Sequence, residues 1–415
     1  IDKRVSEVLR VKFRLGLFDQ PYVADTKAAD RVGGADRNMD FVKQMQQQAL
    51  VLLKNENNIL PLDKRQIKKV LVTGPLADED NFMTSRYGPN GLETVTVLAG
   101  LRNYLKGIAE VDYAKGCDIV DAGWPATEIL PAPMSEQEKQ GIAEAVAKAG
   151  ESDVIIAVLG EDEYRTGESR SRTSLDLPGR QQQLLEALHA TGKPVILVLI
   201  NGQPLTVNWA NAYIPAILES WFPGCQGGTV IAETLFGEHN PGGKLTVTFP
   251  KSVGQIELNF PFKPGSHGSQ PKSGPNGSGA TRVIGELYPF GFGLSYTTFA
   301  YSDLEVSPLR QRTQGEYTVK VNVTNTGKRA GDEVVQLYVR DKVSSVITYD
   351  SQLRGFERIS LKPGETRQVT FSLKPEDLQI LDRNMNWTVE PGEFEVMIGA
   401  SSQDIRLKKT ITALP

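Results

Sequence analysis

One charged stretch of the sequence, residues 160–178, carries the side chains best suited to chemistry. It reads GEDEYRTGESRSRTSLDLP and follows the strongly apolar run 154–159. Glu168 lies near its middle, directly after Gly167, which lets the backbone turn tightly. A carboxyl that gives up a proton near neutral pH needs its pKa raised by partial burial or by a neighbouring carboxylate. Glu168 is therefore our candidate general acid/base, and the alternative is an ordinary surface carboxylate.

The neighbours of Glu168 would shift its pKa in opposite directions. The acids upstream would raise it by repulsion: Glu161, Asp162 and Glu163. The residues downstream are expected to surround the carboxyl with donors and positive charge: Ser169, Arg170, Ser171 and Arg172. The arginines among them would lower the pKa of Glu168. Composition alone therefore nominates Glu168 without deciding its role.

A second candidate stretch is Ser85-Arg86-Tyr87-Gly88-Pro89-Asn90, which follows an expected strand at 70–73. An arginine and a tyrosine beside a rigid Gly-Pro turn suit sugar hydroxyls, because they offer charge-assisted hydrogen bonds and an aromatic face. Arg86 and Tyr87 are our candidates for substrate binding. The alternative is a purely structural turn.

Metal and nucleotide chemistry have little support in the sequence. The three histidines, His189, His239 and His267, are far apart and none has the spacing of zinc ligands. Neither of the Gly-rich phosphate-binding motifs occurs. We therefore expect no metal site and no bound nucleotide.

Composition sets the broad class of protein. The chain has 415 residues, which suggests two or three domains, with 40% hydrophobic and 23% charged residues. Its net charge of −4 offers no basic face to nucleic acid or to an anionic membrane. No apolar run approaches the roughly 18 residues of a transmembrane helix. Cys117 and Cys225 are expected to be isolated buried thiols, with a bond between them left open.

Residues 1–37 are interpreted as a helix followed by a polar linker. Ile1, Val5, Leu9 and Phe13 recur at a spacing of four, which predicts that the chain opens within a helix. We expect that a segment N-terminal to Ile1 has been cut away or belongs to another chain.

Residues 38–250 have the alternating pattern of an α/β domain. Strands are expected at 70–73, 111–114, 154–159, 195–200, 216–221 and 245–249, and helices at 39–53, 97–105, 136–149, 180–189 and 227–236. Ser135 and Glu138 form a capping box for the third of these helices. Continuous apolar strands between amphipathic helices indicate a mostly parallel sheet covered on both faces. The stretch 160–178 then lies at the carboxyl end of a buried strand, where such sheets bind ligands.

The last part of the chain changes character. Residues 251–297 are interpreted as a linker rich in Gly, Pro and Ser. From 298 to 415, alternating apolar residues such as those of 317–323 and repeated turn signals predict an immunoglobulin-like or fibronectin-like β-sandwich. The predicted fold class is thus α/β followed by all-β.

Five collinear stretches resemble glycoside hydrolase family 3 enzymes of the bacterial multidomain β-glucosidase type, over their C-terminal two-thirds or so. They are VLRVKFRLGLF (8–18), ALVLLKN (49–55), KPVILVLINGQP (193–204), LFGEHNPGGKL (235–245) and YPFGFGLSYT (288–297). Together they extend over nearly the whole chain, and the combination is specific.

The resemblance implies a retaining β-glycosidase of three domains. In that family a barrel carries the aspartate nucleophile, an α/β domain carries the general acid/base glutamate, and a fibronectin type III-like domain supports them. Glu168 falls where the acid/base glutamate is found, with Glu161 or Glu163 as fallbacks because the spacing in this loop varies. The nucleophile motif is absent. The nearest string, Ser302-Asp303-Leu304, is interpreted as structural.

The resemblance therefore implies a partner for this chain, an N-terminal barrel that is clipped off or lies on another chain. It also implies an oligosaccharide or glycoside substrate, no metal or organic cofactor, and a periplasmic or secreted location. A β-glucoside is favoured, with a β-xyloside or arabinoside as alternatives. A homodimer is left open, and no nucleic-acid or membrane partner is expected. The rival interpretations are a non-catalytic carbohydrate-binding protein and a nucleotide-using α/β enzyme that lacks its phosphate loop.

Overall fold

The computed structural model describes residues 1–88, 92–255, 258–264, 283 and 285–415. The chain forms two compact units, Ile1–Gln44 and Met45–Pro415. Helices α1 (Asp2–Arg14) and α2 (Ala28–Gly33) belong to the first unit, and α3 (Asp36–Ala49) begins in it. Helix α2 lies in the segment that the sequence predicted to be a polar linker.

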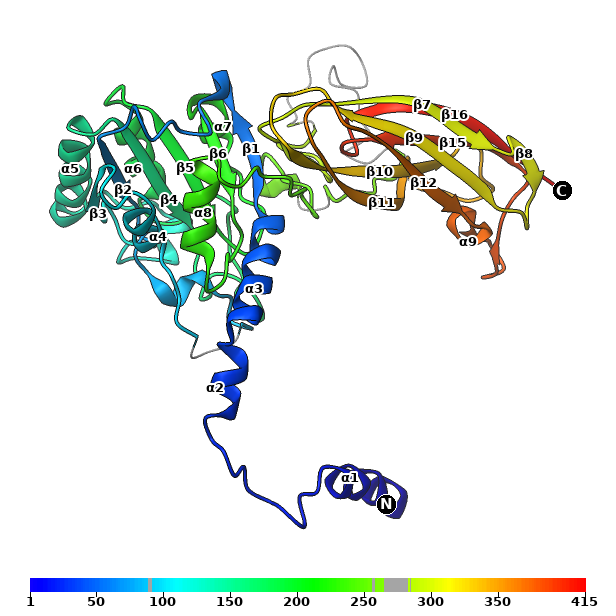
Figure 1. The fold of residues 1–415 in the computed structure, drawn as a ribbon, viewed down its shortest axis with the longest axis horizontal. Coiled ribbons are helices and arrows are strands. Elements are labelled where there is room, and N and C mark those ends of the chain that lie inside the picture. Colours follow the sequence, from blue (N-terminus) through cyan, green and yellow to red (C-terminus); the bar gives the residue numbers. More distant parts are fainter. Residues whose placement is uncertain (89–91, 256–257, 265–282, 284) are drawn as a thin grey trace. The chain divides into compact units, whose positions relative to one another are not determined.

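A six-stranded sheet forms the centre of the α/β part of the second unit (Figure 1). Its strands are β1 (Val51–Asn55), β2 (Lys69–Thr73), β3 (Glu110–Ala114), β4 (Val154–Gly160), β5 (Val195–Ile200) and β6 (Ala216–Glu219). Their order is β1-β6-β5-β4-β2-β3, and every neighbouring pair is parallel except β1 with β6. The prediction of a mostly parallel sheet is confirmed.

Helices cover both faces of this sheet (Figure 1). They are α4 (Val97–Tyr104), α5 (Glu136–Gly150), α6 (Gln181–His189), α7 (Asn208–Tyr213) and α8 (Gly227–Leu235). Alternate residues of β4 enter two different cores: Ile156 packs in a cluster with α4 and α8, and Ile155 in one with α5, α6 and α7. This alternation explains why all seven residues of β4 are buried.

The structure corrects three of the expected elements. Helix α3 ends at Ala49, because residues 51–53 are buried in the antiparallel edge strand β1. The strand expected at 216–221 ends at Glu219. Residues 245–249 form no strand: Phe249 makes only an isolated bridge with Tyr288.

The second part of this unit is a β-sandwich, as predicted. Its larger sheet has the order β11-β10-β15-β16-β8 and its smaller sheet β12-β9-β7. The elements are β7 (Phe299–Ser307), β8 (Arg310–Arg312), β9 (Tyr317–Asn325), β10 (Gly331–Asp341), β11 (Gln352–Leu361), β12 (Thr366–Leu373), α9 (Pro375–Leu378), β13 (Ile380–Leu381), β14 (Trp387–Thr388), β15 (Gly392–Gly399) and β16 (Ile405–Leu414). Tyr317, Val319, Val321 and Val323 all point into the core between the sheets.

Short 3-10 turns complete the described structure: Glu56–Asn58, Asp80–Met83, Ala126–Glu128 and Val253–Gln255. Pro89, Asn90 and residues 256–257, 265–282 and 284 of the predicted Gly/Pro-rich linker lie outside the described residues. No helix within the described ranges has both the length and the apolar composition needed to cross a bilayer.

Candidate active site

The candidate site begins where β4 ends. Gly160 has a φ of +139°, and a Cβ atom there would lie 1.9 Å from the carbonyl oxygen of Ile200 on β5, so only glycine fits this exit. The side chain of Gln181, at the start of α6, accepts from Gly160 N–H at 2.8 Å and donates to its carbonyl at 2.9 Å. The two ends of the loop are thereby joined.

Glu168 lies on the exposed part of this loop, between Gly167 (φ +100°) and Ser169 (φ +61°). Arg86 Nη1–H donates to the carbonyl of Glu168 at 2.8 Å, and the N–H of Glu168 donates to Tyr87 Oη at 2.9 Å. The three residues that the sequence nominated are therefore neighbours. They come together because β2 and β4 are parallel neighbours, so the segments that follow them leave the same edge of the sheet.

The contacts of Arg86 and Tyr87 are with the backbone of Glu168 and leave its side chain unengaged. Within the described residues, the Glu168 carboxylate makes no hydrogen bond and no ion pair. A Cβ atom on Gly167 would lie 3.1 Å from Tyr87 Oη, which is why a glycine suits this close approach. The loop thus presents a free carboxylate on a backbone that is held at both its N–H and its carbonyl.

Arg172 does not surround Glu168, contrary to the expectation from the sequence. Its guanidinium donates to Glu128 Oε1 at 3.0 and 2.7 Å, to Glu161, and to the carbonyl of Asp176 at 2.9 Å. The side chains of Arg172, Glu128 and Glu161 are only 4%, 8% and 0% exposed. The planar guanidinium is drawn to these two buried carboxylates because it can satisfy both at once. We call these three residues the buried clasp.

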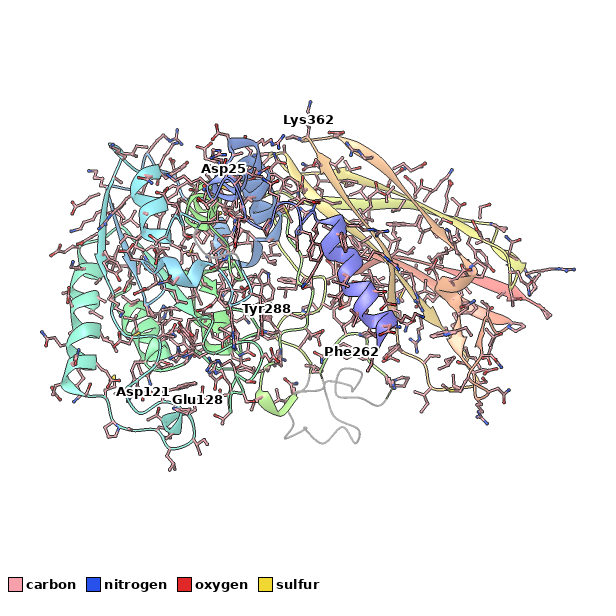
Figure 2. All side chains as sticks on the ribbon, turned by 90° about the horizontal axis from the view of Figure 1, so that it is seen from below. Asp25, Asp121, Glu128, Phe262, Tyr288 and Lys362 are labelled. Carbon is pink, nitrogen blue, oxygen red and sulfur yellow. The ribbon has the colours of Figure 1, made fainter. Side chains whose placement is uncertain are left out.

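Glu128 brings a second segment into the buried clasp. Figure 2 shows it together with Asp121 in the segment between β3 and α5. Thr173 donates to Glu128 Oε2 from its hydroxyl at 2.7 Å and from its N–H at 3.2 Å. Burial alone would raise the pKa of Glu128, but the bonds from Thr173 and Arg172 hold it below its usual value. Glu128 was not nominated from the sequence, because nothing local distinguishes it from a surface acid.

The acids upstream of Glu168 are engaged elsewhere. Glu161 Oε1 accepts from Gln203 Nε2 at 2.8 Å as well as from Arg172, and burial raises the pKa of Glu161. Asp162 is also buried and pairs with Arg165. Both fallback acid/base residues are less accessible than Glu168. Glu161 is fully buried and could contact a sugar only if the buried clasp opened. Glu163 is half-buried.

A further buried acid, Glu219, ends strand β6. It accepts from the N–H of Trp221 at 2.8 Å and from Asn201 Nδ2 at 3.2 Å, and burial raises its pKa to about 8. Asn201 Nδ2 also donates to the carbonyl of Gln203, which connects Glu219 to the buried clasp through Glu161. Glu219 was not nominated from the sequence, although an acid within the expected strand 216–221 indicates a buried carboxyl.

Other candidate groups have structural roles. Asp303 accepts from Ser302 and Asn322, each at 2.9 Å, on strands of the sandwich, which agrees with the structural interpretation. Cys117 and Cys225 are both buried and free. The described part of the chain contains no cluster of three or more His, Cys, Asp or Glu side chains that could hold a metal ion.

Comparison with known proteins identifies the family. Residues 50–296 match the glycosyl hydrolase family 3 C-terminal domain, and residues 333–402 match a fibronectin type III-like domain. The chain is 42% identical to a β-xylosidase of Formosa agariphila and 39% identical to the periplasmic β-glucosidase of Salmonella typhimurium, over 98% of this chain and 54% of each relative. The chain therefore belongs to glycoside hydrolase family 3.

Solved structures agree with this assignment. A β-glucosidase of Erythrobacter marinus superimposes with a TM-score of 0.83 at 38% identity, over 97% of this chain and 54% of its own. A β-glucosidase of Listeria innocua in complex with isofagomine gives 0.84 at 29% identity, over 98% and 54%. The chain spans about half the length of the curated relatives that it matches.

Proposed function

We propose that this chain supplies one half of the active site of a retaining β-glycosidase, in which Glu168 is the general acid/base. An aspartate nucleophile would come from a barrel outside this chain. The observation that carries the proposal is the arrangement at Glu168: its backbone is fixed by Arg86 and Tyr87 while its carboxylate stays exposed and unpaired within the described residues. A proton donor that serves a site shared with another domain needs this combination of a fixed backbone and a free carboxyl.

The proposed reaction has two steps. Glu168 first protonates the glycosidic oxygen while the aspartate attacks the anomeric carbon and forms a covalent glycosyl-enzyme. Glu168, now a carboxylate, then takes a proton from a water molecule whose oxygen attacks the anomeric carbon. This attack breaks the bond between that carbon and the aspartate and releases the sugar. In retaining enzymes the two carboxyl groups lie about 5–5.5 Å apart, so the barrel would have to reach the exposed face of the loop. Arg86 and Tyr87 are proposed to contact the sugar as well, through the side-chain atoms of theirs that do not bond to Glu168.

β-Glucosides are the proposed substrates, with β-xylosides or arabinosides as the alternative. The relatives at 39% and 42% identity are named as a periplasmic β-glucosidase and a β-xylosidase, so sequence similarity supports both sugars. Initial rates on aryl β-glucoside, β-xyloside and α-arabinofuranoside, measured in a protein that includes the barrel, would choose among them. A preference for none of the three would contradict this part of the proposal.

We also propose that residues 38–250 and 298–415 are separate domains joined by 251–297, after a helix and linker at 1–37. The two family matches, 50–296 and 333–402, support an α/β domain followed by a β-sandwich domain. The first match includes residues 251–296, and Tyr288 and Leu294 pair with Phe249 and Leu52 of the α/β part, so the end of the proposed linker packs on that domain. Residues 298–415 expressed alone should then unfold cooperatively. A periplasmic or secreted location is proposed from the name of the Salmonella relative, and cell fractionation would test it.

The dependence of rate on the leaving group tests the role of Glu168. In the barrel-containing protein, Glu168→Gln should slow glycosides with poor leaving groups by about a hundredfold or more, because these depend most on proton donation. It should slow activated aryl glycosides much less in the glycosylation step. The 415-residue chain alone should show no turnover. Turnover by that chain alone, abolished by Glu168→Gln, would place the nucleophile within it and refute the divided site.

A further inference from the structure

The β-sandwich contains a cavity of about 540 Å³ whose lining shares no residue with the loop that carries Glu168. One wall is the end of the sandwich core, with Val339 and Phe394. The other walls carry polar and aromatic side chains from β11, α9 and β14, including Arg354, Glu376 and Trp387. In Figure 1, α9 marks this region beside β12. The cavity therefore combines an apolar floor with charged and aromatic walls.

A β-bulge brings Arg354 into this cavity. Along the β10–β11 ladder, Leu337 faces Gly355 while Tyr338 faces Leu353, so Arg354 is the extra residue between them. Bulges of this kind redirect a side chain and are common next to binding sites. Arg354 lines the cavity together with Val339 and Phe394, which belong to the core. Strand β11 is thus irregular at Arg354, and this irregularity places the guanidinium of Arg354 at the end of the sandwich core.

The guanidinium of Arg354 is incompletely satisfied. It donates to Gln352, but its Nε–H is buried and has no hydrogen-bond partner within the described residues. Burial lowers the pKa of Arg354. A buried donor without an acceptor destabilises the structure, and more so when it is charged. An oxygen-bearing ligand in the cavity would remove that destabilisation.

Trp387 forms an exposed and well-supported wall. Its side chain is 68% exposed on the short hairpin β13–β14, where it pairs with Leu381. The turn of the hairpin is fixed by Asp382, whose Oδ1 accepts from Asn384 N–H at 2.8 Å and from Asn386 N–H at 2.9 Å. The backbone that carries Trp387 is thus fixed, and its exposed indole offers an apolar face to a ligand.

The charges around the cavity narrow the class of ligand. Three carboxylates line it with Arg354: Asp341, Glu376 and Asp377. This excess of negative charge disfavours phosphates and acidic sugars. The unsatisfied N–H of Arg354 needs an acceptor atom, which a bare cation does not have. A neutral polyhydroxylated ligand meets every requirement. Its hydroxyls donate to the carboxylates, its oxygens accept from Arg354, and its C–H faces pack on Trp387.

We propose that this cavity is a second saccharide site, which binds a neutral oligosaccharide without cleaving it. The site is independent of Glu168 and would hold a longer glycan on the sandwich.

The test uses the 415-residue chain with cellotetraose and xylotetraose as probes. The chain has four tryptophans, so the indole N–H signal of Trp387 can be assigned by NMR with the Trp387→Phe variant. We expect that signal to shift saturably with one of the tetrasaccharides. Calorimetry should show binding that Trp387→Ala and Arg354→Met each weaken at least about tenfold, equivalent to about 1.4 kcal/mol.

Phe356→Ala is the matched control, because Phe356 is also 68% exposed on the sandwich but lines a different cavity. It should leave the affinity unchanged, and so should Glu168→Gln, which separates this site from the proposed catalytic one. Thermal unfolding of each variant checks that the sandwich is intact. If the Trp387 signal did not shift at about 10 mM of either tetrasaccharide, the dissociation constant would be too high for a binding site. That result would overturn the proposal. So would binding that survives both Trp387→Ala and Arg354→Met.

Discussion

Replacing Arg172 with Met should destabilise the α/β part of the chain strongly. The substitution keeps most of the apolar stem and removes the guanidinium that joins Glu128 and Glu161 in the buried clasp. Breaking a buried ion pair by removing one partner typically costs about 3–5 kcal/mol, because a charge is left uncompensated. Here two carboxylates lose their cation, but each keeps another donor, Thr173 or Gln203. We therefore expect a loss of about 3–5 kcal/mol and no more.

Urea unfolding followed by tryptophan fluorescence measures this loss. Trp124 is a suitable reporter, because the guanidinium of Arg165 lies 4.9 Å from its ring centre and Arg165 belongs to the same loop. Arg170→Met is the control. Arg170 is exposed and should change the free energy of unfolding by less than about 0.5 kcal/mol.

The buried clasp also predicts a partial rescue. Adding Glu128→Gln and Glu161→Gln to Arg172→Met removes the two uncompensated charges and should recover part of the lost stability. An Arg172→Met chain as stable as the Arg170→Met control would show that the clasp contributes nothing. A triple variant no more stable than Arg172→Met would show that the loss comes from packing and not from charge.

Two further predictions concern single groups at the site. Burial raises the pKa of Glu219 from 4.5 to about 8, so between these values the folded chain keeps a proton that the unfolded chain has released. Stability should therefore fall as pH rises through this range, by up to about 1.4 kcal/mol per unit. Glu219→Gln should remove that slope in unfolding measurements, and a slope that persisted would assign it to another group. Tyr87→Phe removes the acceptor for the Glu168 N–H. Hydrogen exchange of the Glu168 amide should therefore become faster, while the free energy of unfolding falls by only about 1 kcal/mol. An unchanged exchange rate would refute the contact.

Local signals in the sequence predicted most of the fold. The apolar run of β4, the helix α6 and the capping box at Ser135 and Glu138 are all present in the structure, because each is specified by its own residues. Strand β1 was missed because Leu52 continues the apolar spacing of α3. Only its pairing with β6 makes it a strand, and such pairing is not visible in local periodicity.

The sequence nominated residues of the candidate site but did not predict which of them contact one another. Glu168, Arg86 and Tyr87 stood out by residue type, and the parallel order of β2 and β4 explains why they meet. The partner of Arg172 could not be found in this way. Glu128 is separated from Arg172 by 44 positions, and its burial depends on how the segment between β3 and α5 packs.

Chemical rescue by azide tests the central claim most directly. In a protein that includes the barrel, Glu168→Ala should hydrolyse an activated aryl β-glycoside slowly, because a glycosyl-enzyme forms but no base activates water to release it. Azide needs no general base, so it should restore turnover and yield the β-glycosyl azide. Glu163→Ala, altered in the same loop, should remain active and show no rescue. If Glu168→Ala were not rescued and Glu163→Ala or Glu161→Ala were, the acid/base would be one of those residues and our assignment of Glu168 would be wrong.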